Sequence, residues 1–348
     1  MEVIPVRSQL VIPVVDITQV GDARRRAIQT ADAAGFSEAS RGRVAIVASE
    51  LATNLARYAT GGEMQIVSHG GTHGAIDLIA IDRGPGIADV PRCLIDGYST
   101  GGTPGNGLGA ARRLSADFDI YSTPPTGTVV FSRLVDEGRN LTDERFRWGV
   151  AGRPAPYEVV SGDAWQIRQD RERLSIMMVD GLGHGPEAAA AALEAVAEFE
   201  SDPFVALPIM FQRCHDRMRG TRGAAIACAQ LNAVDAKLLY AGIGNIAGHL
   251  RPVPGEHGQG LLSHNGTVGV QIRKSREVTY ECPAEGLLIM HSDGLQSRWS
   301  VDSYPGLALR HPAVIAAILY RDCTRGRDDV TVAAIRFSMG STAGQHAA

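Results

Sequence analysis

The sequence predicts an α+β protein of two domains, and three observations lead to this prediction. The chain has 348 residues, which exceeds a typical domain length of about 150 residues by more than twofold. Segments with helical spacing of apolar residues alternate with short strand-like runs in both halves. The segment 136–147 is charged and poor in large apolar residues, as is typical of a linker. We therefore expect domains at 1–135 and 148–338, with a disordered tail at 339–348.

The longest helix expected in the N-terminal half covers 41–60, where Val44, Val47, Leu51 and Leu55 recur at helical spacing. The other elements expected there are strands near 2–20 and at 64–69, 75–82, 118–122 and 127–134, helices at 21–34 and 108–117, and a glycine-rich lid at 88–109. We expect this half to form a two-layer α/β sandwich.

The C-terminal half contains one strong helix signal, PEAAAAALEAVAEFE at 186–200, with Pro186 in the first turn. The other elements expected there are strands at 158–167, 173–180, 224–231, 237–245, 286–293 and 330–337, and a helix at 312–320. We expect this half to form a β-sandwich flanked by helices.

Composition excludes several functional classes. The formal net charge of −4 argues against the basic surface that binds nucleic acid. Lys237 and Lys274 are the only lysines, so the sequence has no GK pair and no P-loop. The five cysteines are scattered and form no CxxC, which fits reduced thiols rather than disulfides or a zinc site. The N-terminus lacks the order of a signal peptide, and no apolar run approaches the roughly 20 residues that cross a bilayer. We expect a cytoplasmic protein without nucleic-acid or membrane partners.

Two segments near the N-terminus suit a nucleotide. Glu50 and Asn54 are four apart and share a helix face, where Asn can ligate Mg²⁺ and Glu can accept a proton from an attacking hydroxyl. Exposed helices also carry such pairs without any function. Asp82 precedes Gly84 and Gly86, so its carboxylate can accept a hydrogen bond from an exocyclic amine while the glycines admit a flat base. A tight turn after a strand would use the same residues.

A third segment holds Gly105, Gly107 and Gly109 ahead of a helix, and its backbone amides can bind phosphates. It departs from a dinucleotide fingerprint, because no β-rich strand enters it and no acidic residue follows about twenty positions later. Arg112 and Arg113 behind it are either phosphate contacts or solvated helix residues.

Four aspartates in the C-terminal half suit a metal site. Asp163, Asp180, Asp293 and Asp328 each lie where an expected strand ends or a loop begins. A single aspartate there is often a turn cap, but four in this order suit converging ligands, and the carbonyl of Gly181 can join them. Carboxylate oxygens favour Mg²⁺ or Mn²⁺ over zinc. Two such ions would activate a water for in-line attack on a phosphoryl group.

In their order and spacing, the N-terminal segments resemble the ATPase fold shared by DNA gyrase, Hsp90, histidine kinases and MutL, and within it the RsbT-type serine kinases. DGYSTGG at 96–102 is closer to that branch than to the anti-sigma kinases. The resemblance implies that Glu50 is the catalytic base and that Asn54 ligates Mg²⁺. It assigns the binding of ATP, through its adenine and phosphates, to the following residues: Asp82, Gly84, Gly86, Gly105, Gly107, Gly109 and Thr128.

Residues 147–338 resemble the type 2C metal-dependent phosphatases in their SpoIIE branch, and DGLGHG at 180–185 is especially similar to RsbX. The resemblance implies that Asp180 bridges two Mn²⁺ or Mg²⁺ ions in catalysis. It assigns the remaining ligands to Asp163, the Gly181 carbonyl, Asp293 and Asp328. Asp329 occupies a position where the family has Asp or Asn. Leu182 replaces the histidine that larger members offer as a general acid, so His184 is either an acid or a structural residue.

Together the two resemblances imply a bifunctional regulator of partner switching in a stress-response sigma-factor pathway. The first domain would use ATP to phosphorylate Ser or Thr of STAS-domain proteins of the RsbS or RsbR type, and the second would dephosphorylate them. A downstream phosphatase or a sigma-regulatory protein is a further expected partner. In the alternative interpretation only the phosphatase is catalytic, and the N-terminal domain binds ATP as an anti-sigma or antagonist module.

Overall fold

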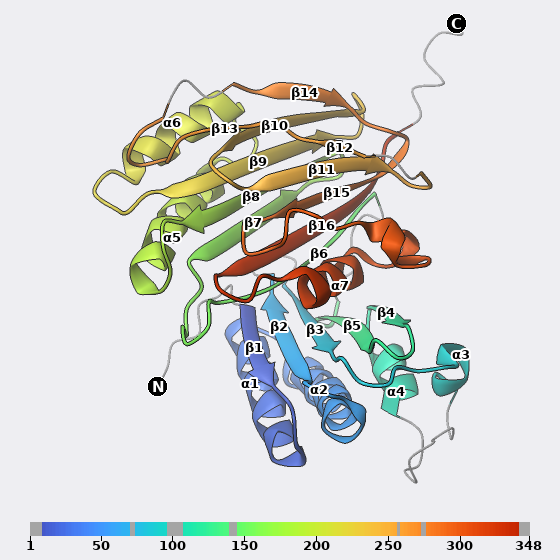
Figure 1. The fold of residues 1–348 in the computed structure, drawn as a ribbon. Coiled ribbons are helices and arrows are strands. Elements are labelled where there is room, and N and C mark those ends of the chain that lie inside the picture. The colour runs from blue at the N-terminus through green and yellow to red at the C-terminus, as the bar shows by residue number, and fades with distance from the viewer. Residues whose placement is uncertain are drawn as a thin grey trace, which may run out of the picture. The chain divides into compact units, whose positions relative to one another are not determined.

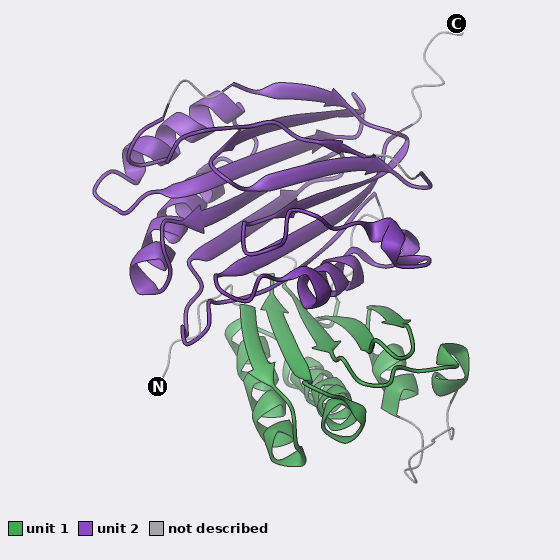
Figure 2. Cartoon of the chain, in the orientation of Figure 1, with its two compact units in different colours: residues 1–142 green, residues 143–348 purple. Residues whose placement is uncertain are grey.

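The structure is a computed structural model that describes residues 9–69, 74–95, 107–138, 145–255, 258–272 and 276–340. The chain separates into two compact units, residues 1–142 and 143–348 (Figure 2). Each unit has its own sheets, helices and apolar core, as is typical of a domain. None of the helices in the described ranges has the length and apolarity needed to cross a membrane.

The N-terminal unit is built on one antiparallel sheet with the strand order β1-β2-β3-β5-β4 (Figure 1). The strands are β1 (Gln9–Pro13), β2 (Glu63–Ser68), β3 (Ala75–Ile81), β4 (Asp117–Ser122) and β5 (Thr128–Val135). Alternate residues of each strand point to opposite faces. The core therefore draws on every second strand residue, such as Ile66, Leu78 and Val130.

Helices cover one face of this sheet (Figure 1). The covering helices are α1 (Val20–Ala33), α2 (Glu38–Tyr58) and α4 (Gly107–Leu114), and the unit also contains the short helices η1 (Ile17–Gln19) and α3 (Val90–Cys93). Helix α2 buries Val44, Val47, Leu51 and Leu55 in the core, as their spacing predicts. One layer of helices on one sheet confirms the expected two-layer sandwich.

The C-terminal unit contains two sheets (Figure 1). The first has the order β13-β10-β9-β8-β7, with β14 also pairing with β10, and the second has the order β12-β11-β15-β16-β6. The strands are β6 (Phe146–Arg153), β7 (Asp163–Gln169), β8 (Arg173–Gly181), β9 (Ala224–Asn232), β10 (Lys237–Ile243), β11 (Ala247–Pro252), β12 (Gln259–Gly260), β13 (Ser263–His264), β14 (Val278–Glu281), β15 (Glu285–His291) and β16 (Val330–Ser338).

Apolar residues of both sheets form one core between them, to which Ile176 and Met178 of β8 belong. The alternate residues Met177 and Val179 instead join a second core beneath helices α5 (Pro186–Ser201) and α6 (Leu207–Arg217). Helix α7 (Pro312–Cys323) packs on β6 and β16, and the short helices η2 (Val301–Ser303) and η3 (Leu307–Leu309) precede it. This arrangement confirms a β-sandwich flanked by helices.

Several expected boundaries differ from the structure. The first residue of the expected linker, Asp136, accepts hydrogen bonds from Ser37 at the start of α2, and β6 begins at Phe146, inside that segment. In the expected tail, the Met339 amide donates to Ala284 O. The expected strand at 158–167 begins only at Asp163, because residues 155–158 form a turn. The remaining tail, 341–348, lies outside the described residues, as do the turn at 70–71 and lid residues 96–106.

Candidate functional sites

The first candidate site lies along helix α2. Glu50 and Asn54 are one helical turn apart, and both approach the first residue of α4. A β-carbon on Gly107 would lie 2.6 Å from Glu50 Oε2 and 4.0 Å from Asn54 Nδ2. The structure therefore brings together the expected base, the expected Mg²⁺ ligand and one lid glycine. It leaves between them only the space that glycine allows.

Asp82 organises the second part of this site. Its Oδ1 accepts hydrogen bonds from the amides of Gly84, at 2.6 Å, and Thr128, at 3.3 Å. The Thr128 hydroxyl hydrogen-bonds to Ser122 Oγ at 2.9 Å, and Ser122 Oγ also accepts from the Ile87 amide. The loop after β3 and the start of β5 are thus joined around one carboxylate.

Helix α2 connects the two parts of this site. A β-carbon on Gly84 would lie 2.9 Å from Tyr58 O, at the C-terminal end of that helix. Glu50 lies eight residues earlier, which is about 12 Å along the axis. Because a side chain at position 84 would clash with Tyr58 O, Gly84 is required for packing against the end of the helix. Gly86 has φ +75°, a conformation that favours glycine.

The remaining expected nucleotide residues fall on α4 or outside the described part. Gly109 is buried in α4, whereas Arg112 and Arg113 are exposed near its C-terminus. Gly105 lies outside the described residues. The phosphate role of this segment stays a prediction.

The second candidate site lies at one end of the sandwich. Asp163 begins β7 and pairs directly with Asp180 near the end of β8. Asp180 continues the series Leu174, Ile176 and Met178, whose side chains face the core between the sheets. The two aspartates therefore extend the inner faces of the sheet at the rim of the core.

Ser292 connects this pair to the other sheet. Its hydroxyl donates to Asp163 Oδ2 at 2.6 Å and accepts from the Thr331 amide at 3.0 Å. Ser292 is fully buried. The other oxygen of the Asp163 carboxylate, Oδ1, is buried without a hydrogen-bond partner. One carboxylate oxygen is thus held by the protein, and the second is left for another ligand.

The other acidic side chains are held by protein donors. Asp293, just after β15, accepts from Asn245 Nδ2 at 2.7 Å. Asp328 is exposed, and its Oδ1 accepts from the Asp329 amide at 2.9 Å. Asp329 is buried, and its Oδ1 accepts from the Ala155 amide at 2.8 Å. Sequence reasoning missed Ser292 and Asn245, although Ser292 directly precedes Asp293 in the HSDG segment.

Burial and mutual repulsion change the acidity of this cluster. Burial raises the pKa of Asp163, and the charges of Asp329 and Asp293 add to the rise, while the Ser292 hydroxyl opposes it. Burial also raises the pKa of Asp180, and among the neighbouring charges those of Asp163 and Asp293 contribute most to the rise. Like charges in a poorly solvated place favour the protonated forms. A bound cation would relieve the same repulsion.

The residues fit hard divalent cations in their chemistry. All candidate ligands are oxygens, as Mg²⁺ and Mn²⁺ prefer, and Asp163 Oδ1 is buried without a partner. Within the described ranges, however, no three acidic, histidine or cysteine side chains stand in an arrangement that would hold a metal ion. In this arrangement Asn245 and Ser292 each hold one carboxylate oxygen, of Asp293 and Asp163 respectively.

The DGLGHG loop runs from Asp180 to α5. A β-carbon on Gly181 would clash with Ala188 of α5, so close packing requires glycine there. His184 is exposed, and its Nδ1 lies 2.6 Å from Glu158 Oε1. This contact fits the structural interpretation of His184 at the helix entry. Arg222 forms an ion pair with Glu187 beside the same loop.

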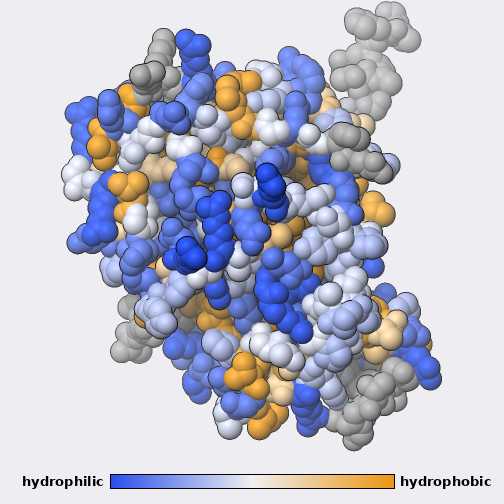
Figure 3. Space-filling view, viewed as in Figure 1, coloured by the Kyte–Doolittle hydropathy of each residue, from blue (hydrophilic) through white to orange (hydrophobic). Residues whose placement is uncertain are grey.

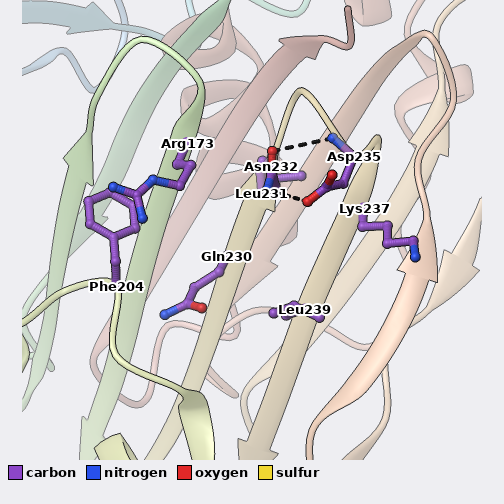
Figure 4. Close-up of a pocket in the computed structure, with 8 residues that line it drawn as sticks. All are labelled: Arg173, Phe204, Gln230, Leu231, Asn232, Asp235, Lys237 and Leu239. Atoms are coloured by element: carbon purple, nitrogen blue, oxygen red, sulfur yellow. Dashed lines mark hydrogen bonds between the residues drawn. The ribbon is translucent and has the colours of Figure 1, made fainter. Parts of the chain in front are cut away.

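A separate pocket of about 140 Å³ lies near the opposite ends of the same strands (Figure 4). Arg173 stacks over the Phe204 ring at 4.3 Å, and Asn232 hydrogen-bonds to Asp235. Its lining residues are Arg173, Phe204, Gln230, Leu231, Asn232, Asp235, Lys237 and Leu239. Arg173 begins β8 and Asp180 lies near its end, so this pocket and the carboxylate cluster are distinct.

Two family models match the chain. Residues 14–133 match the histidine kinase-like ATPase domain, and residues 170–338 match stage II sporulation protein E (SpoIIE). Serine/threonine-protein kinase RsbT of Bacillus subtilis (strain 168) is 36% identical over 110 residues, covering 31% of this chain and 82% of RsbT. Phosphoserine phosphatase RsbX of the same organism is 28% identical over 140 residues, covering 39% of this chain and 68% of RsbX.

Solved structures agree with these matches. A structure described as "The bacterial stressosome: a modular system that has been adapted to control secondary messenger signaling" aligns with a TM-score of 0.51 at 28% identity, covering 56% of this chain and 100% of that one. RsbX in complex with magnesium aligns with a TM-score of 0.51 at 21% identity, covering 56% and 97%. The second likeness shows a shared fold.

The matches define a class of protein in which a histidine kinase-like ATPase domain precedes a domain of the SpoIIE type. The chain belongs to the RsbT family through its N-terminal unit, which is joined to an RsbX-like domain of the SpoIIE type.

Proposed function

We propose that this chain is a bifunctional switch acting on STAS-domain proteins. Its N-terminal unit transfers phosphate from ATP to Ser or Thr of the partner, and its C-terminal unit hydrolyses the resulting phosphoester. The observation that carries the proposal is the presence, in one chain, of the Glu50–Asn54–Gly107 group and of a carboxylate cluster with the free oxygen Asp163 Oδ1.

In the kinase half, Glu50 lies on α2, and Asp82 lies after β3, two residues before the glycine that packs against the C-terminal end of α2. Asp82 offers carboxylate oxygens to the adenine amine, at the end of α2 where Gly84 packs. Asn54 offers a hard oxygen to the Mg²⁺ that accompanies ATP. Glu50 accepts the proton of the attacking hydroxyl. ATP bound by these residues would place its phosphates near Gly107 and the start of α4.

In the phosphatase half, Asp163, Asp180, Asp293 and Asp328 would hold two Mn²⁺ or Mg²⁺ ions, with the Gly181 carbonyl as a further ligand. Such ions activate a water and neutralise charge on the phosphoryl oxygens. The contribution of the protein is to orient the carboxylates, as Ser292 does for Asp163.

The partner class is supported by the relatives. The N-terminal relative is named a serine/threonine-protein kinase and the C-terminal relative a phosphoserine phosphatase, and one similar structure belongs to a bacterial stressosome. We infer a cytoplasmic stress-response pathway with RsbS- or RsbR-like STAS proteins as substrates. A downstream phosphatase or sigma-regulatory protein would receive the signal.

The test uses the full chain with labelled ATP and purified STAS proteins. The Asp180→Asn variant should accumulate phosphorylated partner, because product is no longer removed. Adding Glu50→Ala should abolish this label while partner binding persists. Label that survives Glu50→Ala would refute the proposed base. No label in any variant, with ATP still bound, would leave the N-terminal unit as a non-catalytic antagonist module.

The phosphatase half is tested separately with pre-phosphorylated partner and Mn²⁺. The wild type should release phosphate, and Asp180→Asn should release at least a hundredfold less. Equal rates for the two proteins would overturn the assignment of the carboxylate cluster.

A further inference from the structure

Four exposed apolar side chains lie on the two loops that lead into the carboxylate cluster. Tyr157, Val159 and Val160 precede β7, with exposed fractions of 105%, 90% and 45%, and Leu182 follows Gly181 with 54%. No other loop in the described part of the chain exposes three large apolar side chains. On the face drawn in Figure 3, apolar residues form only small, separate groups. Such a local concentration is typical of an interaction surface.

The two loops are held against each other. Glu158 Oε1 lies 2.6 Å from His184 Nδ1, and the Gly181 amide donates to Gly162 O at 3.1 Å. A β-carbon on Gly185 would lie 2.9 Å from Glu158 Oε2, and the φ of +78° also favours glycine there. These contacts hold the loop that carries Leu182 against the loop that carries the other three side chains.

The first loop is also anchored to the acidic cluster at both ends. The Ala155 amide donates to Asp329 Oδ1 at 2.8 Å, and the loop ends in Asp163. Between these anchors Tyr157 has φ +72°, a conformation that costs free energy for a residue with a side chain. The Tyr157 ring is fully exposed, so no buried contact compensates this conformational cost. Strained and exposed aromatic residues next to a site indicate a function in binding.

We propose that Tyr157, Val159, Val160 and Leu182, here called the entry patch, bind apolar residues that flank the phosphorylated Ser or Thr of the substrate protein. The inference rests on the proposed phosphatase function. The patch adjoins the site, since the first loop ends at Asp163 and is hydrogen-bonded to Asp329, and the second loop follows Asp180 and Gly181. A substrate whose phosphate reaches these carboxylates places its neighbouring residues on the patch. Apolar neighbours of the phosphorylated residue would bury the side chains of the entry patch, whereas acidic neighbours would be repelled by the carboxylates of the site.

The test compares three probes on the full chain with Mn²⁺. They are p-nitrophenyl phosphate and two phosphoserine peptides of about ten residues, with Leu or with Ser at the flanking positions. The wild type should cleave the Leu peptide with kcat/KM about tenfold above that of the Ser peptide. Tyr157→Gly combined with Val159→Ser should remove most of this preference and leave cleavage of p-nitrophenyl phosphate within twofold of wild type.

The variants are chosen so that folding does not confuse the result. Glycine suits the positive φ at Tyr157, and Val159 is 90% exposed. Tyr157→Phe should keep the preference, and Leu309→Ser, at an exposed apolar residue of η3, serves as the matched control. A wild type without preference, or a preference that survives the double variant, would overturn the docking surface.

Two further outcomes separate the alternatives. Failure of the wild type to cleave any probe would refute the phosphatase function itself. A change in oligomeric state of the double variant, with unchanged peptide preference, would show that the entry patch binds a second copy of the chain, and would also overturn the proposal.

Discussion

Asparagine at Asp180 removes one negative charge from the carboxylate cluster and keeps the size of the side chain. Burial and the neighbouring carboxylates raise the pKa of Asp180 to about 8, from an ordinary value of 3.8. With a raised pKa the folded state binds more protons than the unfolded state between these two values. Without metal, its stability therefore falls as pH rises from about 4 to about 8. We expect Asp180→Asn to stabilise the cation-free C-terminal unit at pH 7.

The magnitude follows from the pKa. A solution at pH 7 is about 3 pH units above the ordinary pKa of Asp180. At about 1.36 kcal/mol per unit, the wild-type carboxyl therefore lowers the free energy of unfolding by about 4 kcal/mol at this pH. This is an upper limit, because Asp163 shares its proton uptake with Asp180. We expect a gain of about 1–3 kcal/mol at pH 7 and a smaller gain at pH 5, because pH 5 is only about 1 unit above the ordinary pKa of the unfolded state.

The assay can report on this unit alone. All three tryptophans, Trp148, Trp165 and Trp299, lie in the C-terminal unit, so urea unfolding in EDTA followed by tryptophan fluorescence measures its stability. Saturating Mn²⁺ should reverse the order and stabilise the wild type more than the variant. Asp216→Asn, at an exposed residue of α6, should change the unfolding free energy by less than about 0.5 kcal/mol. A variant no more stable than the wild type in EDTA at pH 7 would refute the reasoning.

Three other predictions concern the two sites. Asp82→Asn should weaken ATP binding at least tenfold in calorimetry, because a charged hydrogen bond contributes about 1.5–3 kcal/mol. The control variant Asp32→Asn, at an exposed residue, should bind ATP like the wild type. Equal affinities of the wild type and both variants would contradict the adenine role of Asp82. Gly127→Ala should lower the melting temperature of the N-terminal unit, measured by circular dichroism, because φ is +105° and the new methyl group would clash with Asp82 O; an unchanged melting temperature would show that this turn rearranges freely. Ser292→Ala should weaken Mn²⁺ binding about tenfold in calorimetry, since Asp163 loses the hydroxyl that orients it, and unaltered affinity would exclude that positioning role.

The elements that the sequence predicted well are those with a long periodic signal. Helix α2 follows from apolar spacing over several turns and keeps the expected buried face, and helix α5 follows from a long helix-forming segment with Pro186 in its first turn. The start of β7 was predicted too early, because Val159 and Val160 look like strand residues but belong to an exposed loop. Local β propensity does not reveal whether a partner strand is available.

The sequence proposes which residues form the candidate sites, but it does not predict their contacts. The order of Glu50, Asp82 and Asp180 along the chain carries the resemblance that assigns them. Their partners lie far away in sequence: Ser292 and Asp163 are 129 positions apart, and Asn245 and Asp293 are 48 apart. No spacing rule connects such pairs.

The sequence by itself determined the two-domain organisation, the long helices and the family, because periodicity and motif order are properties of neighbouring residues. Only the tertiary structure decided how the carboxylates are held. Strand pairing and face alternation place Asp163 opposite Asp180 at the rim of a core, where burial and repulsion raise their pKa values. Those energies depend on distances between segments that folding alone brings together.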